Sequence, residues 1–138
     1  MRLCSIASGS SGNCIYIGSE TTHLLVDVGI SGKRTEEGLN SLDVSPKDLD
    51  GILITHEHAD HISGLGVMAR KFDVPIYSTR GTIAGISMSR SVGDIDGQLF
   101  QAIRKNENIS IGSLMIQAIP ISHDAAEPVC YKVSNSSS

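Results

Sequence analysis

The chain has 138 residues, 40% hydrophobic and 19% charged, which is typical of one compact globular domain rather than of a disordered or membrane chain. Its formal net charge of −4 offers no broad basic surface for nucleic acid, although bound divalent cations would make a pocket locally positive. Three scattered cysteines, no visible signal peptide and no apolar run of membrane length together predict a cytoplasmic protein without a disulfide framework.

The first part of the chain is expected to alternate short apolar strands with helices. Ser31 is a candidate cap for a helix to about Leu42, and Ser45-Pro46 is typical of the start of a short helical turn. Strands are predicted at residues 3–7, 14–18, 23–28 and 51–55, with a Gly/Ser loop at 8–13.

The second part begins with helical spacing and then changes to strands. Apolar residues recur at helical spacing over 62–72, a strand follows at 75–78, and a second helix covers 79 to about 90. Further strands are predicted at residues 99–103, 108–111, 114–121 and 129–133. We therefore expect one mixed α/β (α+β) domain over residues 1–133 and a disordered, Ser-rich tail over 134–138.

The segment T-H-E-H-A-D-H, residues 55–61, gathers three imidazoles and two carboxylates within seven residues. On a loop after a buried strand, His56 and His58 can turn toward one point while Asp60 and His61 reach a neighbouring one. Imidazole suits zinc or manganese, and three such ligands leave an open position for water. The alternative is a solvated loop that is merely rich in histidine, but the H-x-H-x-D-H spacing between a strand and a helix favours a metal site.

One other segment is open to two interpretations. Residues 8–13 either present backbone N–H groups to a phosphate or simply connect two strands, since they match neither common glycine-rich phosphate-binding pattern. Arg70 and Lys71 are expected to be solvated surface residues.

Three motifs resemble those of the metallo-β-lactamase superfamily. T-H-E-H-A-D-H-I-S-G-L resembles its signature metal loop, and L-L-V-D-V-G resembles its first motif, in which Asp27 would brace that loop. I-P-I-S-H-D, residues 119–124, resembles its third motif. The start S-I-A-S-G-S-S-G-N-C and the segment S-H-D-A-A-E-P are similar to the WalJ/YycJ group of bacterial metallo-hydrolases, which is described as having DNA exonuclease activity.

The resemblance implies a four-layer αββα sandwich and a binuclear metal site. It places His56, His58 and His123 on the first ion, and Asp60 and His61 on the second. The family's later bridging Asp and final His have no counterpart after His123. The chain is therefore expected to be C-terminally incomplete, comprising the first half of the sandwich with part of the second.

The function implied is hydrolysis by a metal-bound hydroxide, with DNA as substrate and an exonuclease as the complete enzyme. Two divalent ions, Zn²⁺ or Mn²⁺, are expected in the complete enzyme and one in this chain. Asp60 and Asp124 are the candidate catalytic carboxylates, although for Asp124 a hydrogen bond to a metal ligand is the favoured interpretation. A thioester or ester hydrolase and a non-catalytic metal-binding fragment remain alternatives. The oligomeric state is open, and exposed inner sheet faces would favour self-association of this chain.

Overall fold

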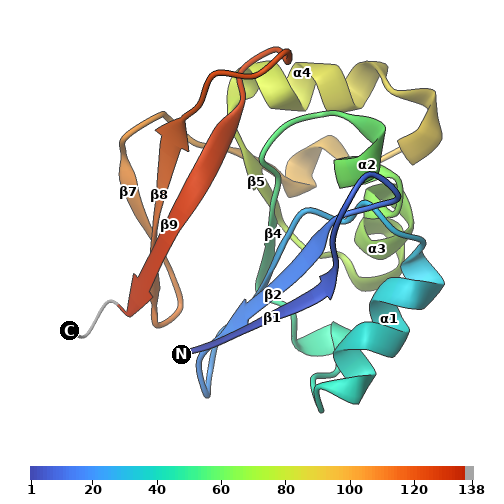
Figure 1. Ribbon diagram of the computed structural model, residues 1–138, viewed down its shortest axis with the longest axis vertical. Coiled ribbons are helices and arrows are strands. Elements are labelled where there is room, and N and C mark those ends of the chain that lie inside the picture. Colours follow the sequence, from blue (N-terminus) through green and yellow to red (C-terminus); the bar gives the residue numbers. More distant parts are fainter. Residues whose placement is uncertain (136–138) are drawn as a thin grey trace.

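A six-stranded sheet forms the centre of the computed structural model, which describes residues 1–135 (Figure 1). Strands β1 to β3 pair antiparallel, whereas β3 to β6 pair parallel. The strands are β1 (Arg2–Ala7), β2 (Cys14–Gly18), β3 (His23–Val26), β4 (Gly51–Leu53), β5 (Ile76–Ser78) and β6 (Phe100–Ala102). Strands β3 and β4 end earlier than predicted, so Asp27 and Thr55 lie in the loops that follow them.

Helices connect the parallel strands, as parallel pairing requires. They are α1 (Gly32–Ser41), α2 (Ala59–Ile62), α3 (Leu65–Phe72) and α4 (Arg80–Met88), with 3₁₀ turns at Pro46–Asp48, Arg90–Val92 and Gly97–Leu99. As predicted, the side chain of Ser31 caps α1, accepting a bond from the backbone of Arg34 at 3.2 Å.

The single helix predicted over 62–72 is wrong, because the chain breaks between α2 and α3. Gly64 lies at the break, and its N–H donates to the carbonyl of Val28 at 2.9 Å. A Cβ at this position would lie 1.9 Å from the carbonyl oxygen of Ile30. The close backbone approach therefore requires glycine and separates the two helices.

The smaller sheet contains β7 (Asn108–Ile111), β8 (Leu114–Pro120) and β9 (Val129–Asn135) in antiparallel order. Strand β9 is longer than predicted, since Ser134 and Asn135 pair with Met115 and Leu114. These two residues therefore belong to a strand and not to the expected tail, whose remainder, residues 136–138, lies outside the described residues. Burial alternates along β8 between buried and half-buried residues, so one of its faces is more fully covered than the other.

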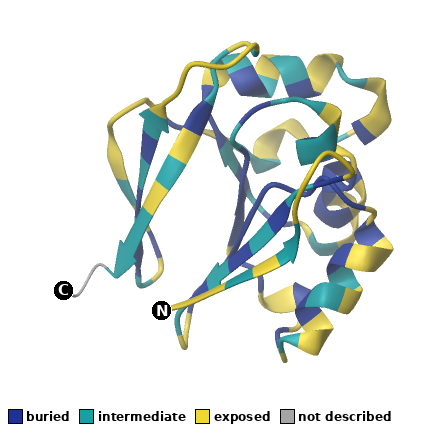
Figure 2. Ribbon diagram, in the orientation of Figure 1, coloured by how far each residue is buried: buried dark blue, intermediate teal, exposed yellow. Residues whose placement is uncertain are grey.

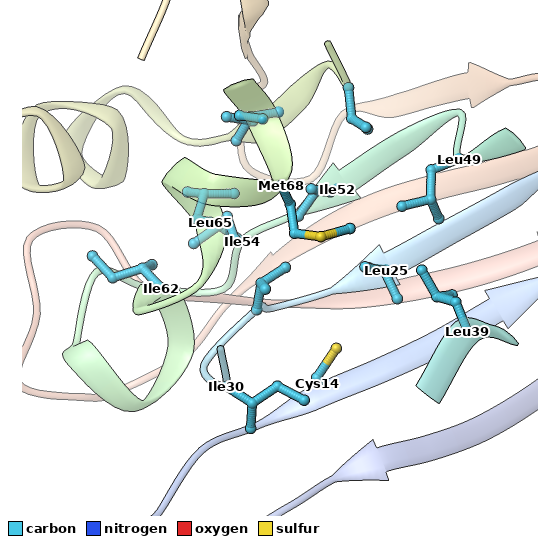
Figure 3. Close-up of a cluster of buried hydrophobic side chains, with 14 of the residues drawn as sticks. Cys14, Leu25, Ile30, Leu39, Leu49, Ile52, Ile54, Ile62, Leu65 and Met68 are labelled. Carbon is cyan, nitrogen blue, oxygen red and sulfur yellow. The ribbon is translucent and has the colours of Figure 1, made fainter. Parts of the chain in front are cut away.

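Two apolar layers flank the six-stranded sheet. On one side, Leu25 and Ile52 pack with Leu65 and Met68 of α3 (Figure 3). On the other side, the core combines Leu24, Val26 and Leu53 with Ile111, Leu114 and Ile116 of the small sheet. The central strands are accordingly the most buried part of the molecule (Figure 2).

Helices, a large sheet and a small sheet thus form successive layers, which confirms the mixed α/β class and is consistent with an αββα sandwich. No helix within residues 1–135 is both long and apolar enough to cross a membrane.

Candidate metal centre

The candidate site lies where the carboxyl ends of β3 and β4 meet the loop between β8 and β9. Asp27 directly follows β3, and His56 and His58 follow β4, so the parallel pairing of these strands brings them to one edge. Open α/β sheets commonly bind ligands at this edge. His123 arrives from the β8–β9 loop of the small sheet.

His56, His58 and His123 form the core of the site. One ring nitrogen from each lies within 4.8 Å of those of the other two, and this is the only such group of three potential ligands within residues 1–135. Ring centroids are 4.8 Å apart for His56 and His58, and 4.5 Å apart for His56 and His123. A tetrahedral ion with Zn–N bonds of about 2.0–2.1 Å separates its ligand atoms by about 3.4 Å. A movement of roughly 1 Å would therefore close the three imidazoles on one ion.

Asp27 is the bracing residue that the sequence motif implies. Its buried carboxylate accepts bonds from the Thr55 N–H and hydroxyl, each at 2.8 Å, and from Nδ1 of His61 at 2.6 Å. Its backbone has φ 64°, in the left-handed region that aspartate tolerates better than most residues. The carboxylate thus joins the ends of β3 and β4 to the metal loop instead of facing the three imidazoles.

These bonds determine which ring nitrogen of His56 is available to a ligand. The Thr55 hydroxyl gives its single proton to Asp27 and therefore accepts from Nδ1 of His56 at 2.9 Å. Nδ1 of His61 likewise donates to Asp27. Nε2 of His56 is then left with a free lone pair, whereas Nε2 of His61 accepts from the side-chain amide of Asn13 at 3.3 Å. Outer hydrogen bonds such as those of Thr55 and Asp27 orient metal-binding histidines.

The pKa values of His56 and His61 are shifted in opposite directions. Burial and, to a smaller extent, the positive charge of a protonated His61 together lower the pKa of His56 from 6.5 to about 4, so His56 is neutral at pH 7. Burial alone would lower the pKa of His61, but its hydrogen bond to Asp27 and the charges of Asp27 and Asp60 outweigh burial and raise it. A neutral imidazole is the form that binds a metal.

Asp60 and His61 lie beside the three imidazoles and face Asn13. Nε2 of His61 is 3.6 Å from an oxygen of Asp60, and the side-chain nitrogen of Asn13 lies 3.3 Å from that Nε2 and 3.4 Å from the same oxygen. The amide of Asn13 therefore contacts both groups that a second cation would use. Sequence reasoning missed this residue because the loop at 8–13 suggested a phosphate cradle or a plain connection.

Two glutamates hold the loop that carries His123. A carboxylate oxygen of Glu57 accepts from the N–H of Ala126 at 3.0 Å, and its other oxygen is buried without a hydrogen-bond partner among the described residues. The carboxylate of Glu127 accepts from the N–H of Gly81 at 2.9 Å, at the start of α4. Neither residue was singled out from the sequence. Asp124, by contrast, is exposed and forms no hydrogen bond or ion pair within residues 1–135.

An apolar cleft of about 570 Å³ between the two sheets reaches the site, with Asp27, His56 and His61 in its lining. Its apolar walls come from Ile15, Ile17, Val26, Val129, Tyr131 and Val133. His56 and His61 are therefore accessible from between the sheets.

Several known proteins are similar to this chain. Exodeoxyribonuclease YycJ of Bacillus anthracis is 41% identical over 130 residues, which are 94% of this chain and 48% of that protein. Exodeoxyribonuclease WalJ of Streptococcus pneumoniae serotype 2 is 39% identical over 127 residues, 92% of this chain and 47% of that protein. The chain thus spans about half the length of these curated relatives.

Solved structures agree on the fold. A B3 metallo-beta-lactamase with an active-site glutamic acid superposes with a TM-score of 0.80 at 16% identity, covering 95% of this chain and 53% of that one. The Rm3 metallo-beta-lactamase gives 0.80 at 14% identity, covering 96% of this chain and 54% of that one. A sequence model of the metallo-beta-lactamase superfamily matches residues 7–106, which is most of the chain, and the chain therefore belongs to that superfamily.

Proposed function

We propose that this chain is the metal-binding part of a hydrolase that cleaves phosphodiester bonds of DNA and, as a complete enzyme, acts as an exonuclease. The observation that carries the proposal is the convergence of His56, His58 and His123, with ligand atoms within 4.8 Å of one another. The choice of DNA draws support from two relatives of 41% and 39% identity that are named exodeoxyribonucleases.

In this proposal each polar residue of the site takes part in metal binding, positioning or substrate contact. His56, His58 and His123 would hold a first ion, and Asp60 and His61 would contribute to a second, with zinc or manganese suited to this mixture of nitrogen and oxygen. When bound, such ions supply a water nucleophile of lowered pKa and positive charge for the phosphate oxygens. Asp27 keeps His61 and the metal loop in place. Asp124, exposed and next to His123 in the chain, would orient substrate or exchange a proton with solvent.

A second candidate, a thioester or ester hydrolase, is favoured by the apolar cleft. The cleft holds about 570 Å³ and reaches His56 and His61, so it could accommodate an acyl chain that a nucleic acid would not need. Fold alone does not separate the two substrate classes. A metal-binding fragment without catalysis is the third possibility, because only Asp60 and His61 serve the second ion.

The experiment compares the 138-residue chain with a chimera. In the chimera, this chain is followed by the part of the Bacillus anthracis relative that lies beyond the matched segment. Both proteins are incubated with Mn²⁺ and end-labelled DNA, and in parallel with a thioester. We expect the chimera to release nucleotides from DNA ends and the 138-residue chain to do so poorly, because two metals must together neutralise the attacking and leaving oxygens.

Two histidine variants provide the controls. His58→Ala should abolish cleavage by the chimera. His23→Ala should leave cleavage intact, because His23 lies outside the site. Its ring nitrogen forms a hydrogen bond of 2.6 Å with the hydroxyl of Tyr16. A folded chimera that ignores DNA but hydrolyses the thioester would refute the substrate. Robust DNA cleavage by the 138-residue chain, abolished by Asp60→Ala, would refute the view that the second ion lacks ligands here.

A further inference from the structure

A second, basic pocket of about 450 Å³ lies next to the loop that carries His123. Its charged lining consists of Arg80, Arg104, Lys105 and Glu127. Arg80 is the first residue of α4, whereas Arg104 and Lys105 follow β6, so the three cations meet only in the folded chain. This concentration of positive charge contrasts with the formal net charge of −4 of the whole chain. We call Arg80, Arg104 and Lys105 the basic pocket residues.

The cations of the pocket are available to a ligand. All three are exposed, and the side chains of Arg80 and Arg104 form no hydrogen bond or ion pair within the described part of the chain. Lys105 lies 3.7 Å from a carboxylate oxygen of Glu127, whose other oxygen already accepts from the backbone of Gly81. By contrast, Arg70 donates to two carbonyls and Lys71 pairs with Glu36.

Glu127 connects this pocket to the candidate metal centre. It lines the pocket and lies four residues after His123 in the same loop. Four residues span at most about 14 Å even when fully extended. Successive phosphates of one DNA strand are spaced by about 3.4 Å along a duplex axis. The backbone of Glu127, at the wall of the pocket, is therefore within about four nucleotide spacings of the backbone of His123. Figure 1 shows the same proximity, with the β8–β9 loop beside α4.

We propose that the basic pocket binds backbone phosphates of a nucleic-acid strand whose end lies at the three imidazoles. Guanidinium groups form paired hydrogen bonds with phosphate oxygens, and a neighbouring lysine adds a point charge. Contacts of this kind position a strand without reading its sequence, which suits an enzyme that degrades DNA from an end. This inference rests on the proposed function, because it takes the strand to be the substrate of the same site.

The test measures binding separately from cleavage. Fluorescence anisotropy follows a labelled single-stranded phosphorothioate oligonucleotide, which keeps its backbone charge but resists hydrolysis, as it binds the 138-residue chain at several salt concentrations. The variant carries three substitutions, Arg80→Gln, Arg104→Gln and Lys105→Gln. Each phosphate contact on a single strand contributes about 0.7 to the slope of log K against log salt. We expect the variant to lose about 2 in slope and tenfold or more in affinity at about 0.1 M salt.

The matched control removes the same charge from α1 and the turn at Pro46–Asp48, which lie away from α4 (Figure 1). Its substitutions are Lys33→Gln, Arg34→Gln and Lys47→Gln, all at exposed positions. This control should retain most of the affinity and slope. If the two triple variants bind the oligonucleotide equally well, the basic pocket does not bind backbone phosphates. The same conclusion follows if the unsubstituted chain does not bind the oligonucleotide. The single substitution Arg104→Gln repeats the comparison if the triple variant fails to fold.

The cleavage assay of the proposed function gives an independent answer. If the chimera cleaves DNA but the triple variant of the basic pocket residues binds the oligonucleotide as well as the control does, phosphate binding by the pocket is refuted and the proposed function stands. If the oligonucleotide binds through the pocket but the chimera hydrolyses only a thioester, the pocket stands and the proposed function fails.

Discussion

Replacing Asp27 with asparagine should destabilise the metal loop and the whole chain. The carboxylate accepts three bonds of 2.6 to 2.8 Å, two on one oxygen and one on the other. An asparagine amide has one accepting oxygen, so at least one of the partly buried donors of Thr55 or His61 would face an NH₂ group. An unsatisfied buried donor costs about 1–3 kcal/mol, and the loss of charge-assisted bonds adds to this. We expect a loss of about 3 kcal/mol in the free energy of unfolding, which is roughly 10 °C in a chain of this size.

Thermal and urea unfolding of Asp27→Asn and of the unsubstituted chain measure this loss, and metal content after dialysis gives a second readout. Asp50→Asn is the matched control, because Asp50 is exposed and accepts one bond, from the N–H of His23 at 2.8 Å. We expect its effect to be below about 1 kcal/mol. If Asp27→Asn unfolds within about 2 °C of the unsubstituted chain, less than 1 kcal/mol, and retains its metal, Asp27 is not the brace of the site.

Elemental analysis of His58→Ala after dialysis should find much less zinc or manganese than in the unsubstituted chain, and unchanged stoichiometry would contradict the ligand assignment. Glu57→Ala releases the N–H of Ala126 and should weaken metal binding about tenfold, whereas Glu57→Gln retains an acceptor and should restore most of the affinity. If the two Glu57 variants bind metal equally, the bond to Ala126 does not position His123. Burial lowers the pKa of His56 from 6.5 to about 4. Between these two pH values the unfolded metal-free chain binds a proton at this residue and the folded chain does not. The free energy of unfolding should therefore fall as pH drops from 6.5 to about 4. Urea titrations should show that the unsubstituted chain loses up to about 3 kcal/mol more than His56→Asn over this pH range. If the free energies of unfolding of the two proteins change in parallel with pH, protonation of His56 is not the cause. Light scattering during size-exclusion chromatography should show self-association through the apolar cleft between the sheets, and a monodisperse monomer with a cooperative thermal transition would contradict this.

Local patterns were sufficient to predict most elements and the metal loop. The apolar runs at 23–28 and 51–55 indicated buried strands because their residues pack on both faces of a central sheet. The H-x-H-x-D-H spacing directly after such a strand placed His56 and His58 at one sheet edge. His123 required the family motif, since nothing in its own surroundings shows which distant residues it meets.

The remaining features depend on tertiary contacts that no local pattern encodes. Gly64 breaks a helix because another backbone segment passes at contact distance, and Ser134 extends β9 because β8 offers it a partner. Asn13, Glu57 and Glu127 are ordinary polar residues in the sequence. They become part of the site only because the loops that carry them pack against Asp60, Ala126 and α4.

The three imidazoles come from two different sheets, and this origin gives a bound ion a mechanical role. His56 and His58 follow β4 of the large sheet, whereas His123 belongs to the hairpin of the small sheet. An ion held by all three would act as a reversible cross-link between segments far apart in the chain. Because the site forms only in the folded chain, the free energy of metal binding would add to the free energy of unfolding. Removing the ion would loosen the small sheet first, with faster amide exchange in β7 to β9 than in β3 and β4. By the same linkage, substitutions in the apolar layer between the sheets would change metal affinity without touching a ligand.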